Sequence, residues 1–141
     1  AMGTDGAASN NSTDMLESLK LAALMQKGIH RDAAVITADN VIRMATVNGA
    51  KAIGMENKLG TLENGKKADL IIFNPRHLKS APMHHADATV VYASSEENID
   101  TTIINGKIVY HKGKFSCGIQ EEELIEKIDR EIIKLKSKIN L

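Results

Sequence analysis

A single carboxylate in a glycine-rich segment is the first candidate for chemistry. Asp5 lies between glycines in the run Gly3-Thr4-Asp5-Gly6, inside a turn-rich stretch that covers residues 1–12. A carboxylate at the mouth of such a loop can approach a metal ion or a water molecule closely. The alternative is an Asx-turn, in which the carboxylate caps its own backbone. From the residue types alone, the Asx-turn is the better-supported interpretation.

The five histidines do not form a metal-binding motif. None of them is spaced as His-x-His or as a helical His-x-x-x-His pair, and His84 and His85 are adjacent, so their side chains diverge on a helix or a strand. We interpret these two as part of a polar loop near Pro82. Zinc needs three or four converging ligands, and no local cluster supplies them. The full set is His30, His77, His84, His85 and His111.

Other catalytic and phosphate-binding patterns are also missing. Cys117 and its neighbour Ser116 lie in no nucleophile motif, and the lysines after Gly65 lack the glycine spacing of a phosphate-binding loop. Asn10 and Asn11 are interpreted as residues that shape the loop around Asp5.

The composition limits the classes of function. The chain has 141 residues, enough for one domain, with 18 Lys and Arg against 18 Asp and Glu. A formal charge of zero argues against capture of nucleic acid or of anionic membranes. Only 3% of the residues are aromatic, which disfavours base-stacking platforms. A single cysteine is typical of a reducing compartment, and we expect a cytoplasmic protein.

Two helices are predicted to follow the Asp5 loop. The first covers about residues 14–27, with Asp14 and Glu17 as a capping box and Gly28 as its end. The second begins near Thr37 or Asp39 and reaches about residue 53, with an interruption at Gly49. Their apolar faces need a cover, and they contain Met15, Leu16, Leu19, Val41, Ile42 and Met44.

Short apolar runs predict strands in the middle of the chain. Residues 70–73 are predicted to be a buried strand, and residues 89–92 a second one. Asn105-Gly106 between two β-branched runs predicts a hairpin over residues 101–110, because both residues accept positive φ. Lys112-Gly113 is expected to form the next turn.

An amphipathic helix is predicted for residues 121–138. Acidic residues cluster at its N-terminal end and lysines at its C-terminal end. Both placements interact favourably with the helix dipole. Apolar side chains recur along one stripe, and burying them would contribute about 7–15 kcal/mol as an upper bound. We therefore expect this helix to dock, on its own chain rather than on a partner. The stripe consists of Leu124, Ile128, Ile132, Leu135 and Ile139.

Four stretches resemble, in the same order, motifs of the amidohydrolase superfamily. The closest resemblance is to the methylthioadenosine/S-adenosylhomocysteine deaminase and chlorohydrolase group. Residues 3–15 resemble the loop after the last barrel strand, and residues 44–52 resemble the "ATxNGAKALG" helix. Residues 60–71 resemble the "G-x-L-x-x-G-K-x-A-D-L" strand entry, and residues 103–109 resemble the "V-x-V-N-G-K-x-V" hairpin.

This resemblance implies a metal-dependent hydrolase. Family members hold zinc or iron at the mouth of a TIM-like barrel, and a metal-bound hydroxide attacks a purine or triazine ring and releases ammonia or chloride. The aspartate that matches Asp5 binds the metal or its water and helps to deprotonate that water. The resemblance therefore makes Asp5 both the catalytic and the metal-ligand candidate. Methylthioadenosine deaminase, triazine chlorohydrolase and guanine deaminase remain open as branches.

The sequence also departs from the family pattern. The His-x-His ligands, the later histidines, the catalytic glutamate and most barrel strands have no counterpart here. We therefore expect the C-terminal part of an amidohydrolase, of α+β class and without the TIM barrel itself. Residues 1–56 would be the end of the barrel, with its metal-aspartate loop and two helices. Residues 57–141 would be part of a small antiparallel β-sandwich and the C-terminal helix.

This division predicts an inactive isolated chain. One carboxylate does not assemble a zinc centre, so this chain is expected to bind no metal and to deaminate nothing alone. Its partners would be the missing barrel portion or a second copy, since the helix faces need cover. The alternative is a non-catalytic structural or oligomerisation module that keeps the fold.

Overall fold

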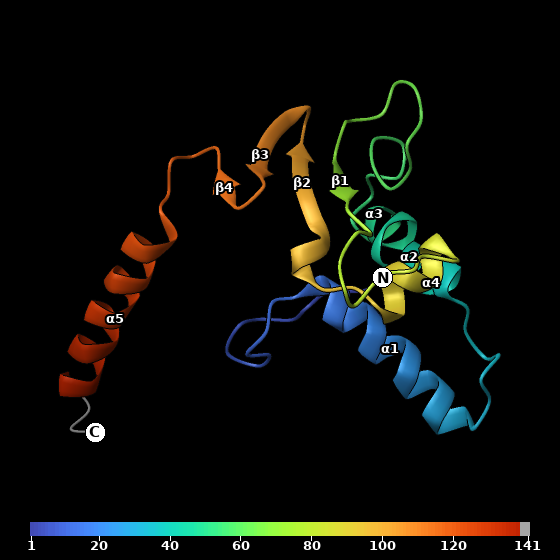
Figure 1. Cartoon of the computed structure of the whole chain (residues 1–141), viewed down its shortest axis with the longest axis horizontal. Helices are drawn as coiled ribbons and strands as arrows, with labels where there is room; N and C mark the ends of the chain where they lie inside the picture. Colours follow the sequence, from blue (N-terminus) through green and yellow to red (C-terminus); the bar gives the residue numbers. More distant parts are fainter. Residues whose placement is uncertain (139–141) are drawn as a thin grey trace.

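The computed structural model describes residues 1–138 and shows five α-helices and one antiparallel sheet in that part of the chain (Figure 1). The sheet has the order β1-β2-β3-β4. The helices are α1 (Met15–His30), α2 (Ala38–Ala45), α3 (Val47–Ala52), α4 (Ala86–Tyr92) and α5 (Glu121–Lys138). The strands are β1 (Leu70–Phe73), β2 (Ile99–Ile104), β3 (Lys107–His111) and β4 (Lys114–Phe115), with a short 3₁₀ turn, η1, at Glu96–Asn98. The α+β class predicted from the sequence is confirmed.

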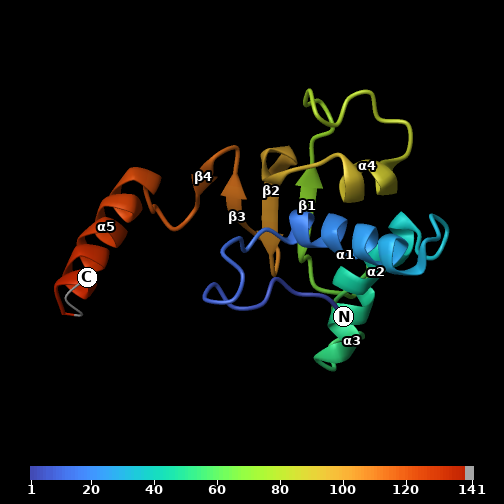
Figure 2. The same cartoon turned by 90° about the horizontal axis from the view of Figure 1, so that it is seen from below.

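The helical core joins α1, α2 and α4. Val41 of α2 and Val91 of α4 are almost fully buried against Leu16 and Leu19 of α1. Part of the predicted apolar face of the first two helices is thus covered within the chain. Figure 2 shows these helices at one end of the molecule and α5 at the other. Helix α4 belongs to the second predicted domain, residues 57–141, but packs against helices of the first, residues 1–56. The domain boundary between residues 56 and 57 stays a prediction.

The strand predicted for residues 89–92 is wrong. These residues form the end of α4, where Thr89 N donates to His85 O at 2.9 Å and the Thr89 hydroxyl donates to the same carbonyl. A short β-branched run does not distinguish a buried helix from a strand. Packing of residues 89–92 against α1 and α2 stabilises the helical conformation.

The boundaries of the first two predicted helices also need correction. The first helix continues past Gly28 to His30, and Arg31 takes the left-handed conformation (φ 51) that the sequence suggested for the glycine. The second breaks at Thr46 rather than at Gly49. The Thr46 hydroxyl donates to Ile42 O at 2.9 Å, and this kind of side-chain bond competes with regular helix geometry.

The β-hairpin prediction is confirmed. β2 and β3 pair antiparallel, with Asn105 (φ 50) and Gly106 (φ 77) in the turn, and Lys112-Gly113 connects β3 to β4. β1 also pairs with β2, as a strand at residues 70–73, but it is only half-buried rather than buried. Ile71 and Ile72 are 49% and 48% exposed.

The C-terminal helix has the predicted range but not the predicted packing. α5 spans residues 121–138, and none of its side chains is buried. Figures 1 and 2 both show it extending away from the sheet. The expectation that it docks on its own chain is therefore wrong for the described residues. Ile139, the last member of the predicted stripe, lies outside them.

Candidate functional site

The loop around Asp5 is ordered by its own polar groups. Asp5 has a φ of 63°, in the left-handed region that aspartate tolerates better than most residues. Its Oδ1 accepts a hydrogen bond from Gly6 N at 2.7 Å, and the residue is exposed. The carboxylate thus bonds its local backbone, as the alternative to a functional role expected, but to the next residue rather than two residues on as in an Asx-turn. The same carboxylate remains open to solvent.

Asn10 holds the two sides of this loop together. Its Nδ2 donates to Thr4 O at 2.9 Å, and its Oδ1 accepts from Ser12 N at 3.2 Å. The backbone N–H groups of Ser9 and Asn10 both donate to Gly6 O at 2.9 Å. These bonds agree with the loop-shaping role predicted for Asn10. They fix the backbone on either side of Asp5 without using its carboxylate.

Asp14 connects the loop to α1. Its Oδ1 accepts from Leu16 N at 2.7 Å, and so it caps the first turn of the helix. The buried Leu16 and Leu19 then anchor that turn in the core. The position of Asp5 is therefore set by a short path from the helical core through Asp14 and Asn10.

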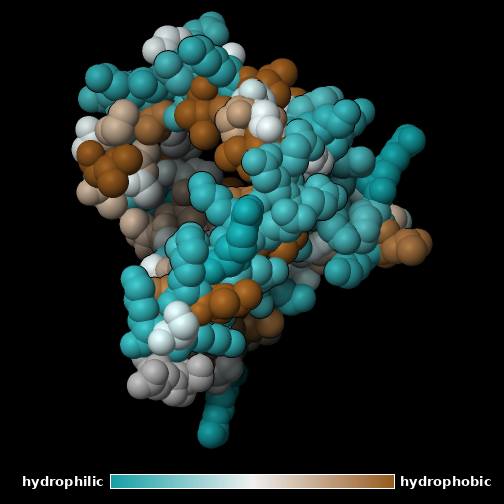
Figure 3. Space-filling view, turned by 90° about the vertical axis from the view of Figure 1, so that its left-hand side faces the viewer, coloured by the Kyte–Doolittle hydropathy of each residue, from teal (hydrophilic) through white to brown (hydrophobic). Residues whose placement is uncertain are grey.

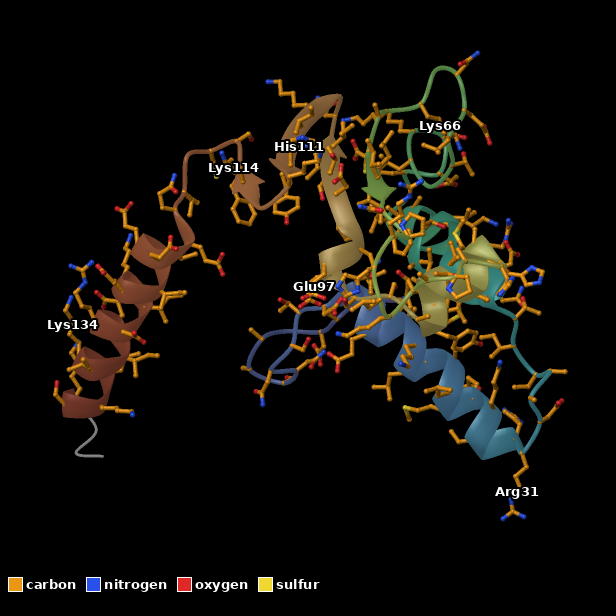
Figure 4. All side chains as sticks on the ribbon, in the orientation of Figure 1. Arg31, Lys66, Glu97, His111, Lys114 and Lys134 are labelled. Atoms are coloured by element: carbon orange, nitrogen blue, oxygen red, sulfur yellow. The ribbon has the colours of Figure 1, made fainter. Side chains whose placement is uncertain are left out.

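The histidines do not converge on Asp5. His77 lies 3.1 Å from a carboxylate oxygen of Glu97, and His111 is within 2.8 Å of the Thr101 hydroxyl. His84 and His85 are exposed just before α4. Figure 4 shows Glu97 and His111 among the side chains of the sheet region, and Arg31 projecting beyond the end of α1.

The described residues do not by themselves fit a zinc ion. Across residues 1–138, no three His, Cys, Asp or Glu side chains lie close enough together to hold a metal. Zinc needs at least three protein ligands, and Asp5 would be one. No catalytic step is therefore assigned to this chain alone.

A large apolar hollow of the described chain lies away from Asp5. A groove of about 1480 Å³ runs between α1 and the β1–β2 part of the sheet. We call it the α1–sheet groove. Its lining begins at Ser12 and does not include Asp5. Sequence reasoning identified the α1 and α2 faces that need cover but not this groove, since a groove depends on how the sheet is placed against the helices.

The family motifs contact one another in space. Gly60 (φ +94) approaches α3 so closely that a Cβ on it would lie 3.0 Å from the Ala50 Cβ. Asp69 Oδ1 accepts from Asn105 N at 2.5 Å, and Gly106 N donates to Ala68 O at 3.0 Å. The 44–52, 60–71 and 103–109 stretches therefore form one continuous structural unit.

The family model described as "Amidohydrolase family" matches residues 1–109. The chain belongs to the amidohydrolase family. It is 42% identical over 134 residues to 5-methylthioadenosine/S-adenosylhomocysteine deaminase of Moorella thermoacetica, covering 95% of this chain and 31% of that protein. It is 39% identical over 108 residues to an S-triazine hydrolase of Gordonia rubripertincta, covering 77% of this chain and 23% of that protein.

A solved structure supports the same fold. An adenosine deaminase from Xanthomonas campestris with bound zinc superposes with a TM-score of 0.92 at 30% identity, over 97% of this chain and 31% of that one. The chain thus spans about a third or less of the length of the proteins that it matches.

Among residues 1–138, no helix combines the length and the apolar character needed to cross a bilayer.

Proposed function

We propose that this chain supplies the C-terminal part of a metal-dependent amidohydrolase that deaminates a purine nucleoside. One observation carries the proposal: the 42% identity to 5-methylthioadenosine/S-adenosylhomocysteine deaminase extends over 95% of the chain. The family model, which matches residues 1–109, includes the Asp5 loop as well as α1–α4 and most of the sheet. Triazine hydrolysis is the second candidate, with a shorter match over 77% of the chain.

Within this function, Asp5 is the residue that we assign to the reaction. A carboxylate can stabilise a cation and accept a proton from water. Its fixed backbone and exposed side chain are compatible with that role. The remaining ligands of a zinc or iron centre would come from other parts of the enzyme, because Asp5 alone does not make a site. The isolated chain is then inactive.

A chimaera tests the activity. Residues 1–141 would replace the matching region of the Moorella deaminase, and ammonia release from S-adenosylhomocysteine would be measured. We expect the chimaera to be active and Asp5→Asn to lower kcat by at least about 100-fold, the scale of a lost proton acceptor. Asp32→Asn is the control, because Asp32 is an exposed aspartate that only caps Ala34 N. A folded but inactive chimaera would contradict the proposal.

The non-catalytic alternative makes a different prediction. If the chain is only a structural module, Asp5→Asn leaves the activity of the chimaera unchanged. Turnover of S-adenosylhomocysteine by the purified 141-residue chain would separately contradict the inactivity that we propose for it.

A further inference from the structure

The Asp5 loop is held by hydrogen bonds within this chain. Exposed apolar side chains, brown in Figure 3, lie on a chain that spans about a third of the length of its relatives. Their exposure therefore identifies no partner. The loop differs, because the hydrogen bonds that shape it join residues 4–16 to one another. Its conformation is a property of this chain.

Asn10 bonds the backbone on both sides of Asp5. Its Nδ2 donates to Thr4 O at 2.9 Å, and its backbone N–H donates to Gly6 O at 2.9 Å. Thr4 O belongs to the peptide group directly before Asp5, and Gly6 O lies in the second peptide group after it. The side chain and the backbone of Asn10 therefore hold the two segments between which Asp5 lies.

These bonds oppose the relaxation of a strained backbone. Asp5 has a φ of 63°, and a residue with a Cβ stays in this left-handed conformation only when its surroundings hold it there. A flip of the Thr4–Asp5 peptide group is the local motion that changes this φ. Such a flip moves Thr4 O away from the Nδ2 of Asn10. Asn10 thereby keeps Asp5 in the conformation that sets the direction of its carboxylate.

Asn10 also ties the loop to the helical core. Its Oδ1 accepts from Ser12 N at 3.2 Å, the Ser12 hydroxyl accepts from Asp14 N at 3.2 Å, and Asp14 caps α1. At the other end of the loop, Met2 packs against the core. Asn10 is half-buried, whereas Asn11 is exposed and makes no side-chain hydrogen bond within residues 1–138. The hydrogen bonds thus give the loop-shaping role predicted for both asparagines to Asn10 rather than to Asn11.

We propose that Asn10 is a positioning residue for the deamination and acts through Asp5, whose carboxylate it keeps directed for reaction. This inference rests on the function proposed above, in which Asp5 accepts a proton from water. A proton acceptor works only within hydrogen-bond distance of the proton that it takes, so a misdirected carboxylate slows the reaction although it is still present. The amide of Asn10 bonds only backbone groups and touches no reacting atom.

The first test is Asn10→Asp in the chimaera with the Moorella deaminase. The two side chains have nearly the same shape, but aspartate offers no donor to Thr4 O and still accepts from Ser12 N. We expect kcat to fall by about 10–100-fold and KM to change by less than about twofold, because misplacement affects the reaction rather than binding. Asn64→Asp, the same change of charge in an exposed turn, is the control and should keep the full kcat.

A double-mutant cycle shows whether Asn10 acts through Asp5. In an Asp5→Asn background, Asn10→Asp should lower kcat by less than about a further twofold, since the group that it positions is already lost. A merely structural residue would lower kcat by the same factor in both backgrounds. If Asp5→Asn itself leaves kcat unchanged, the proposed function fails. If Asp5→Asn lowers kcat and Asn10→Asp does not, only the positioning role fails.

The conformation of Asp5 provides a readout that needs no activity. In a residue with positive φ, the amide and α protons lie close together and give a strong nuclear Overhauser effect. The 141-residue chain should show this signal at Asp5, Asn10→Asp should weaken it, and Asn11→Asp, the matched control, should keep it. Absence of the signal from the unmodified chain, an unchanged signal in Asn10→Asp, or multiplicative losses of kcat in the cycle would each overturn the proposal.

Discussion

The carboxylate of Asp69 accepts a hydrogen bond from the backbone N–H of Asn105, 36 residues later in the chain, at 2.5 Å. Asp69 lies just before β1, and Asn105 begins the turn between β2 and β3. The side chain that precedes one strand therefore holds the turn at the end of the neighbouring hairpin. Two of the four family-like stretches are joined at this contact.

Loss of this contact should destabilise the sheet. Asp69→Asn replaces a charged acceptor by a neutral one, and Asp69→Ala removes it. We expect Asp69→Ala to lower the free energy of unfolding by about 1.5 kcal/mol, the lower end of the range for a hydrogen bond to a charged group, because Asp69 is exposed. Urea unfolding followed by circular dichroism measures it. Asp129→Ala on the exposed helix α5 is the control, and an equal loss there would contradict the role of Asp69.

The close approach of Gly60 to α3 gives a second prediction. Gly60 and Gly65 both have positive φ, +94 and +89, but only Gly60 has neighbours within 4 Å of an added Cβ. Gly65→Ala should cost about 1 kcal/mol for the backbone conformation. Gly60→Ala should cost about 2–4 kcal/mol, because the Cβ must also displace Ala50 and Val47. Equal unfolding free energies for the two variants would argue against a tight contact.

Asn98 is a buried polar residue that joins distant parts of the chain. Its Nδ2 donates to Asn74 O at 2.8 Å and to the Ser80 hydroxyl at 2.9 Å, and its Oδ1 accepts from Ser95 N at 3.0 Å. Asn98→Ala removes all three hydrogen bonds from a buried position and takes one partner from the buried Ser80 hydroxyl, and we expect a loss of about 2–4 kcal/mol in unfolding free energy.

A double-mutant cycle isolates the Asn98–Ser80 contact. Ser80→Ala and the double variant are measured beside Asn98→Ala, and the two changes should be non-additive by about 0.5–3 kcal/mol. The exposed Asn64 provides the control, as Asn64→Ala should change the stability by less than about 0.5 kcal/mol. Strict additivity would show that the two side chains act independently.

The role of Asp14 as the N-cap of α1 can be distinguished by stability measurements from the catalytic role proposed for Asp5. Asp14→Ala should cost about 1 kcal/mol through loss of the bond to Leu16 N, and Asp14→Asn should restore most of it, since asparagine also caps helices well. Asp5→Asn should leave the melting temperature of the chain unchanged. A stability loss from Asp5→Asn as large as that from Asp14→Ala would indicate a structural role for Asp5.

Local signals in the sequence determined the elements that depend on local chemistry. Turn and capping residues predicted three of them: the turns at Asn105-Gly106 and Lys112-Gly113 and the cap at Asp14. The periodic spacing of apolar residues predicted the range 121–138 of the last helix. The amidohydrolase resemblance rested on four short motifs of the same kind. The family match over residues 1–109 confirms it.

Tertiary structure decided what depends on contacts between distant residues. Residues 89–92 form helix rather than strand because Val91 packs against α1 and α2, and a short apolar run has no local feature that fixes the choice. The exposure of α5 and the groove between α1 and the sheet likewise depend on where whole elements lie. The periodicity of α5 showed that the stripe needs an apolar partner, but only the fold showed that none of the described residues buries it.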